Sequence, residues 1–140
     1  MSNSATDRKR TTLLPLVALL GRTSLAVLFL FSGVTKLLDF PAATQEMASH
    51  HLPVPAGIAA GVIIVQLVGS VLLITPRYAR IGAAMLALFT VMATLIAHMP
   101  WSGNPPTLEL PQFILVMMNL GIMGGFLAIA AQRADDPSQK

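Results

Sequence analysis

Six polar side chains interrupt the apolar stretches of this 140-residue chain, and their chemical types are those that hold a small ligand. They comprise two hydroxyls, an amine, an imidazole and two amides: Ser32, Lys36, Gln66, Thr94, His98 and Asn119. An imidazole exchanges protons near neutral pH, and amines and amides donate hydrogen bonds to carbonyl oxygens. Polar residues inside membrane helices are costly and by default mark a functional site. We therefore expect a shared ligand pocket, with Arg22 as a separate charge of structural or functional importance.

The same residues also have a simpler interpretation as packing residues. Amides such as Gln66 and Asn119 commonly bond between membrane helices, at about 0.6 kcal/mol on average. Lys36 lies near a helix end and can extend to the headgroups, and His98 can be an interfacial histidine. Ser32 lies one helical turn from Lys36 on the same face, at a depth similar to His98 and Asn119. That common depth favours the pocket.

Cysteine is absent from the chain, which limits its own redox and metal chemistry. Without cysteine there is no thiolate nucleophile, iron–sulfur cluster or Cys-based zinc site. Glu46, His50 and His51 are close in sequence, with His98 as a further imidazole. Adjacent histidines point to different sides of a helix, however, and a metal ion needs three or four ligands. We predict no metal site, and expect electrons to come from a bound cofactor or a partner.

Four apolar runs must position these side chains. About 20 apolar residues as helix cross the bilayer core. The chain is 54% hydrophobic and 11% charged, with mean hydropathy +0.71, whereas a soluble domain carries about 25% charged residues. We therefore expect an all-α integral membrane protein, a four-helix antiparallel bundle over residues 12–132 with disordered cytoplasmic tails at 1–11 and 133–140. Its helices are expected at about 13–38, 56–74, 81–99 and 112–131.

The basic residues indicate the topology. They cluster before the first run, around the Pro76–Arg80 turn and after the fourth run, whereas 39–55 and 100–111 contain none. Since cytoplasmic loops carry the Lys/Arg excess, both termini and that turn are predicted to be cytoplasmic, in a bacterial inner membrane. No cleavage motif precedes Arg22, so the first run is expected to be a retained helix rather than a signal peptide. Residues 41–50 can form a short interfacial helix.

Small residues indicate how the helices contact one another within the lipid bilayer. Gly57 and Gly61, and likewise Gly121 and Gly125, have the G-x-x-x-G spacing. Small residues also follow one face of the third run, namely Ala83, Ala87, Thr90, Thr94 and His98. We expect a tight bundle, and the glycine faces leave a homo-oligomer open. The net charge of +3 lacks a basic stripe with interleaved aromatics, so nucleic acid is not an expected partner.

Read in order, the motifs resemble the DoxX family of small four-helix bacterial membrane proteins. The resemblance covers about residues 18–131. Its motifs are Gly21-Arg22, an S-G-x-x-K-L arrangement at Ser32-Gly33 and Lys36-Leu37, Leu52-Pro53, Gln66-Leu67-Val68-Gly69, Thr75-Pro76-Arg77, Ala93-Thr94 to His98, and Gln112-Phe113 through Asn119-Leu120 to Gly124-Gly125.

The resemblance implies a redox-associated inner-membrane protein, because related subunits of sulfur-oxidation systems are linked to thiosulfate:quinone oxidoreduction. The family often has glutamate at the position of Gln66 and lysine at that of Met118. Neither residue present here carries charge, so a proton relay or ion pair does not carry over to them. The family positions that do carry over are Arg22, Ser32, Lys36, His98 and Asn119.

Two hypotheses of different classes follow. In the first, the chain is a quinone- or quinol-binding subunit of a sulfur or oxidative-stress redox system. Lys36 and His98 would then bind the ring oxygens of the quinone cofactor, Asn119 would position the ring, and a partner redox protein would supply electrons. In the second, the chain is a non-catalytic membrane adaptor that docks or stabilises a partner oxidoreductase. A small-solute transporter has less support, because no broken helix offers a binding site.

Overall fold

In a computed structural model of the chain, residues 3–98 and 110–131 are described. Every element among these residues is helical, as the sequence predicts. The long helices are α1 (Asn3–Leu38), α3 (Pro55–Ile74), α4 (Ala79–Ala93) and α5 (Leu110–Ala131). A short helix, α2 (Phe40–Ser49), follows α1, and one π-helical segment, η1 (Thr94–His98), continues α4.

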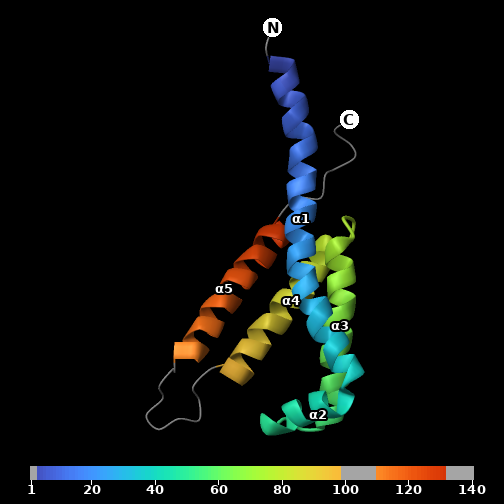
Figure 1. Cartoon of the computed structure of the whole chain (residues 1–140), viewed down its shortest axis with the longest axis vertical. Coiled ribbons are helices and arrows are strands. Elements are labelled where there is room, and N and C mark those ends of the chain that lie inside the picture. Colours follow the sequence, from blue (N-terminus) through green and yellow to red (C-terminus); the bar gives the residue numbers. More distant parts are fainter. Residues whose placement is uncertain (1–2, 99–109, 132–140) are drawn as a thin grey trace.

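Four segments are long and apolar enough to cross a membrane, which confirms the predicted all-α membrane protein. They are Pro15–Leu38, Pro55–Ile74, Ala79–Ala97 and Phe113–Ala131. Successive spans run in opposite directions, so that the start of α1 and the end of α5 lie at the same end as the α3–α4 turn (Figure 1). We call this the turn end, and the opposite end, across which α2 lies, the α2 end.

The beginning of α1 differs from the prediction. The helix starts at Asn3, so the expected disorder of residues 1–11 is wrong for residues 3–11, and the predicted helix start near residue 13 is too late. Pro15 therefore lies inside the helix rather than in its first turn. A proline removes one backbone hydrogen bond and crowds one carbonyl, but it leaves the other turns intact. No glycine or other proline precedes it to end the helix. The predicted tail 133–140 lies outside the described residues.

Glycine brings α3 and α4 into backbone contact at the turn end. A Cβ atom on Gly82 would overlap the backbone nitrogen of Leu73 and lie 2.6 Å from the carbonyl oxygen of Gly69. The glycines of the predicted G-x-x-x-G pairs do not make backbone contacts of this kind with a neighbouring helix of this chain. A Cβ atom on Gly61 or Gly121 would meet no atom within 4 Å. The spacing places two glycines on one helix face, but it does not determine which face meets a neighbouring helix.

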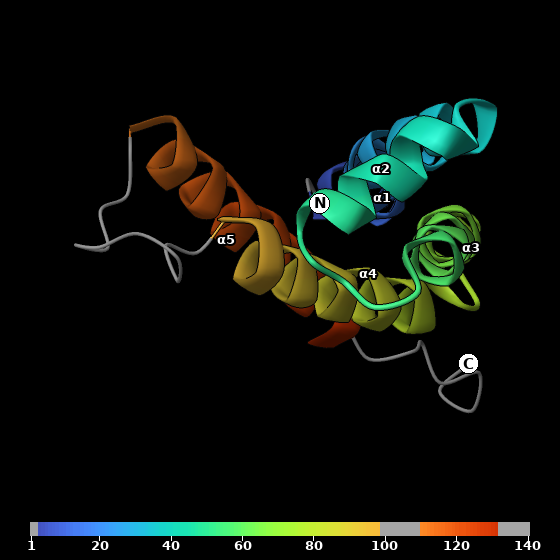
Figure 2. The same cartoon turned by 90° about the horizontal axis from the view of Figure 1, so that it is seen from below.

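An aromatic cluster ties α1, α4 and α5 together. The ring centroid of Phe29 on α1 lies 5.5 Å from that of Phe126 on α5 and 6.1 Å from that of Phe89 on α4. The predicted small-residue face of α4 is also buried at Ala83 and Thr90. Viewed from the α2 end, α4 lies between α3 and α5, and α1 packs alongside α3 (Figure 2). From the aromatic cluster toward the α2 end, α5 diverges from α1 (Figure 1).

Candidate functional site

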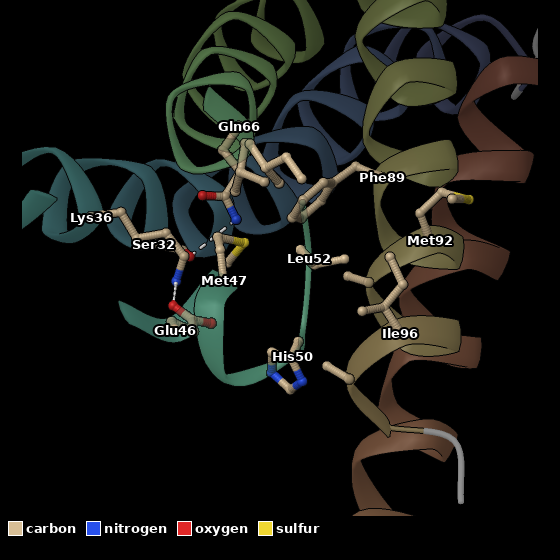
Figure 3. Close-up of a pocket in the computed structure, with 14 residues that line it drawn as sticks. Ser32, Lys36, Glu46, Met47, His50, Leu52, Gln66, Phe89, Met92 and Ile96 are labelled. Carbon is tan, nitrogen blue, oxygen red and sulfur yellow. Dashed lines mark hydrogen bonds and ion pairs between the residues drawn. The ribbon is translucent and has the colours of Figure 1, made fainter. Parts of the chain in front are cut away.

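A cavity of about 480 Å³ lies at the α2 end, between α1, α2, α3 and the last turns of the α4–η1 helix (Figure 3). Most of its wall is apolar, and its side chains include Leu52, Ile58, Val62, Phe89, Met92 and Ile96. Five polar side chains also line it: Ser32, Lys36, Glu46, His50 and Gln66. The structure therefore brings three predicted site residues together and adds Glu46 and His50, which come from α2 and its end.

Lys36 and Glu46 form an ion pair between α1 and α2, with Nζ 2.8 Å from Oε2. The pair is possible because α2 begins directly after α1. The Asp39 carboxylate accepts a hydrogen bond from the Ala42 backbone nitrogen at 3.1 Å and caps the new helix. α2 then packs Ala43 and Met47 toward α3. Lys36 therefore lines the cavity and is paired with Glu46. The alternative prediction had its side chain extending into the headgroups.

Gln66 bridges α3 and α1 at the wall of the cavity. Its Nε2 donates a hydrogen bond to the hydroxyl oxygen of Ser32 at 3.1 Å. The glutamine is only 3% exposed, and its Oε1 has no hydrogen-bond partner. The helices come this close because Gly33 lacks a side chain, and a Cβ atom there would lie 3.2 Å from Cβ of Gln66. Figure 3 shows Gln66 and His50 on opposite sides of the cavity.

Asn119 does not line this cavity. Its Nδ2 donates a hydrogen bond at 2.8 Å to the hydroxyl of Thr94, which in turn donates to the Thr90 carbonyl oxygen at 2.7 Å. Asn119 instead lines a second cavity of about 290 Å³ between α1, α4 and α5, which also touches Ser32 and Gln66. Thr94 lines neither of the two cavities. The Asn119–Thr94 pair therefore matches the predicted alternative of an interhelical amide bond, and Gln66 lies where the two cavities adjoin.

The remaining predicted residues lie elsewhere. The backbone of His98 ends η1, but its side chain lies outside the described residues, so its predicted role stays a prediction. Arg22 lines neither cavity, and its Nε is buried without a hydrogen-bond partner among the described residues. Among residues 3–98 and 110–131, no three His, Asp or Glu side chains are grouped so as to hold a metal ion.

Glu46 and His50 were missed as ligand-site residues, although a signal for them was present. The sequence places them one turn apart on the short helix, and it places the cap Asp39 immediately after α1. In the structure, the helix that starts at Asp39 brings Glu46 to 2.8 Å from Lys36 on α1. Only the angle between α1 and α2 turns the polar face of α2 to the cavity instead of the membrane surface.

Comparison with known proteins agrees with this architecture. The sequence model of the DoxX family matches residues 17–99. The chain is similar to the inner membrane protein YphA of Escherichia coli (strain K12), with 25% identity over 116 residues that cover 83% of this chain and 82% of the relative. No solved structure matches the chain.

Proposed function

The chain belongs to the DoxX family and is a multi-pass inner-membrane protein, and from this premise we propose that it binds the ring of a quinone or quinol in the larger cavity. The observation that carries the proposal is a mostly apolar cavity with polar groups at two opposite places. Its volume of about 480 Å³ lies within the range of about 300–1,000 Å³ that is usual for small-molecule sites.

The composition of the wall suits an apolar ring. Phe89, Met92 and Ile96 line the cavity from α4 and η1 (Figure 3), and Val62 lines it from α3. Aromatic and thioether groups make favourable contacts with ring faces and edges. A quinone ring carries its oxygens at opposite ends, and the cavity has polar side chains at Gln66 on one side and at His50 on the other. The ring would therefore lie between them, with its oxygens near these two groups.

The polar residues supply hydrogen bonds and a proton route. The Lys36 ammonium, oriented by Glu46, donates to a ring oxygen, and a hydrogen bond from a charged group contributes about 1.5–3 kcal/mol. His50 exchanges a proton with a ring oxygen, because imidazole is the side chain best suited to do so near neutral pH. Bound quinone or quinol supplies the redox chemistry. Since the chain has no cysteine, we propose that a partner redox protein exchanges the electrons.

We further propose that the turn end faces the cytoplasm, which places the larger cavity in the outer half of the membrane. This follows from the positive-inside rule applied to Arg77 and Arg80, both exposed at the turn end. Arg80 also donates a hydrogen bond to the Ala130 carbonyl oxygen at 3.0 Å, which satisfies the end of α5 on that side. The proton route through His50 would then open to the periplasm.

The proposal is tested by titrating the full-length protein in mild detergent, without oxygen, with a decyl-substituted benzoquinone and its quinol. We expect saturable binding that Lys36→Met and His50→Leu each weaken by about tenfold or more, because each removes a hydrogen bond to a ring oxygen. His98→Leu tests the remaining predicted imidazole in the same assay. Ile64→Met, on an exposed face of α3, is the matched control and is expected to bind as the unaltered protein does.

Absence of saturable binding by the unaltered protein would overturn the proposal. Binding that is indifferent to both Lys36→Met and His50→Leu would equally exclude this cavity as the site. In either case the membrane adaptor for a partner oxidoreductase becomes the working hypothesis.

A further inference from the structure

The two cavities have walls of different chemistry, and they adjoin at one place. Lys36, Glu46 and His50, the ionisable side chains of these walls, all line the larger cavity at the α2 end. None of the described residues that line the smaller cavity, of about 290 Å³, is ionisable. Four residues line both cavities, namely Ser32, Gln66, Phe89 and Ala93. A compartment with charged groups therefore adjoins a compartment without them.

The wall of the smaller cavity continues onto the lipid-facing surface between α1 and α5. Here α5 packs on α4 and makes few contacts with α1, and the two helices diverge toward the α2 end (Figures 1 and 2). Leu28 and Phe31 of α1 line this cavity, and they are 50% and 72% exposed. In a membrane these apolar side chains lie against acyl chains, so the smaller cavity borders the lipid.

The place where the cavities adjoin lies near the middle of a membrane span. From Pro55, the first residue of its span, to Gln66 the α3 helix rises about 16 Å. The whole span, Pro55–Ile74, is about 30 Å long, which is the thickness of the hydrocarbon core. The larger cavity thus extends from the middle of the bilayer toward the α2 end, and the smaller cavity lies near the level of the acyl-chain ends.

We infer that the ligand is a quinone or quinol with a long apolar tail, which passes Ser32 and Ala93 into the smaller cavity and leaves between α1 and α5. The inference rests on the proposed function and adds the tail of the ligand and its route. The ring then lies among the charged groups. The tail meets an uncharged wall, whose Thr90 and Asn119 side chains already donate hydrogen bonds to the Leu86 carbonyl oxygen and to Thr94.

The same placement determines how the ligand enters. Moving each methylene group of a tail from lipid into water is unfavourable, so a tailed quinone stays in the bilayer until it binds. The opening between α1 and α5 admits the ring sideways from the lipid, after which the tail occupies the path that the ring has taken. Binding in this way requires no transfer of the tail through water.

The first test locates the tail on the unaltered full-length protein in mild detergent. The probe is a decyl-substituted benzoquinone that carries a photoreactive diazirine at the far end of its tail. We expect irradiation to attach the tail to residues at the opening, and mass spectrometry of the fragments to identify Leu28, Phe31 or Ile122. An excess of decyl-substituted benzoquinone without the diazirine is expected to remove this labelling.

The second test narrows the smaller cavity alone. Leu28→Trp adds bulk to a residue that lines the smaller cavity and not the larger one. We expect it to weaken binding of the decyl-substituted quinone about tenfold, and binding of the same ring with a methyl group in place of the tail less than about twofold. Each affinity is compared with that of the unaltered protein for the same probe, so partition into detergent cancels.

Leu20→Trp is the matched control. It makes the same change at an exposed position of the same helix, lines neither of the two cavities, and is expected to leave both affinities unchanged. The labelling experiment needs no variant, so it decides the inference even if Leu28→Trp does not fold.

The outcomes separate the inference from the proposed function. If neither the tailed nor the methyl quinone binds, the proposed function fails and the inference fails with it. If both bind but the removable label lies on α2 or α3, or Leu28→Trp affects the two probes alike, only the inference is overturned. Labelling at the opening that excess quinone does not remove would assign the smaller cavity to an acyl chain of the membrane and would also overturn it.

Discussion

At the scale of residues, the two amides that the sequence presents as equivalent have different environments. Asn119 donates to Thr94 on a neighbouring helix, whereas Gln66 donates to Ser32 and retains an unpartnered buried oxygen. The first arrangement is an interhelical bond with a packing role. The second joins α3 to α1 beside the larger cavity, which Gln66 lines and Asn119 does not.

A double-mutant cycle on Asn119 and Thr94 tests the packing role. Asn119→Leu and Thr94→Val each remove one side of the 2.8 Å hydrogen bond, so their effects on the free energy of unfolding should not add. We expect a coupling of about 0.6 kcal/mol, the average for such bonds in membrane proteins. Unfolding in denaturing detergent measures it. Quinol affinity is expected to be unchanged in Asn119→Leu, and a large loss would show that Asn119 also serves the ligand.

At the scale of elements, α2 is the feature that closes the cavity. Local signals start it, since Asp39 caps its first turn. The ion pair between Lys36 and Glu46 then ties it to α1. The link to α3 contains His51 and Val54 at φ 57° and 50°, a conformation that is strained for a β-branched residue such as valine. A tight link of this kind directs Leu52 into the cavity wall.

The contact of α3 with α4 depends on one glycine, and Gly82→Ala tests it. The added methyl group would overlap the backbone of Leu73, which cannot move as a side-chain tip could. We expect a loss of about 2 kcal/mol or more in unfolding free energy, at the upper part of the range for overpacked cores, and a lower thermal midpoint. Gly61→Ala is the matched control, because open space surrounds that position. It should leave stability unchanged or raise it by up to about 1 kcal/mol, since alanine favours helix over glycine. Equal effects of the two substitutions would contradict the assigned contact.

At the scale of the whole molecule, the bundle is open on one side. The aromatic cluster of Phe29, Phe89 and Phe126 joins α1 to α5, but the two helices diverge toward the α2 end. Open space surrounds Gly121 and Gly124 on α5. These glycines are therefore available to a second copy of the chain, and the predicted homo-oligomer through glycine-rich faces stays a prediction.

Single introduced cysteines test the orientation of the whole molecule. Because the chain has no cysteine of its own, any labelling is assigned to the introduced thiol. Ser49→Cys at the α2 end and Tyr78→Cys at the turn end introduce exposed thiols. In spheroplasts, a membrane-impermeant maleimide is expected to label the first at once and the second only after permeabilisation, because the positive-inside rule predicts that the basic turn end is cytoplasmic. The reverse pattern would place the cavity in the inner half of the membrane and contradict the proposed proton route.

The sequence by itself determined the class of the molecule: an all-α membrane protein with four spans and a short helix after the first. Those features depend on local properties, namely the length of each apolar run and the start signals of each helix. It also predicted a pocket from the similar depth of Ser32, Lys36, His98 and Asn119, because depth along a helix follows directly from residue number. Of the six residues predicted for that pocket, Ser32, Lys36 and Gln66 line the larger cavity.

Only the tertiary structure decided which face of each helix meets which neighbour. In lipid the outward faces are as apolar as the buried ones, so hydrophobic periodicity does not reveal the rotation of a helix about its axis. For that reason the tertiary structure alone identified Gly82 as the close contact, paired Asn119 with Thr94, and turned Glu46 and His50 toward the cavity. The hydrogen bond between Gln66 and Ser32 is likewise a property of the packed helices, since it depends on which faces of α1 and α3 meet.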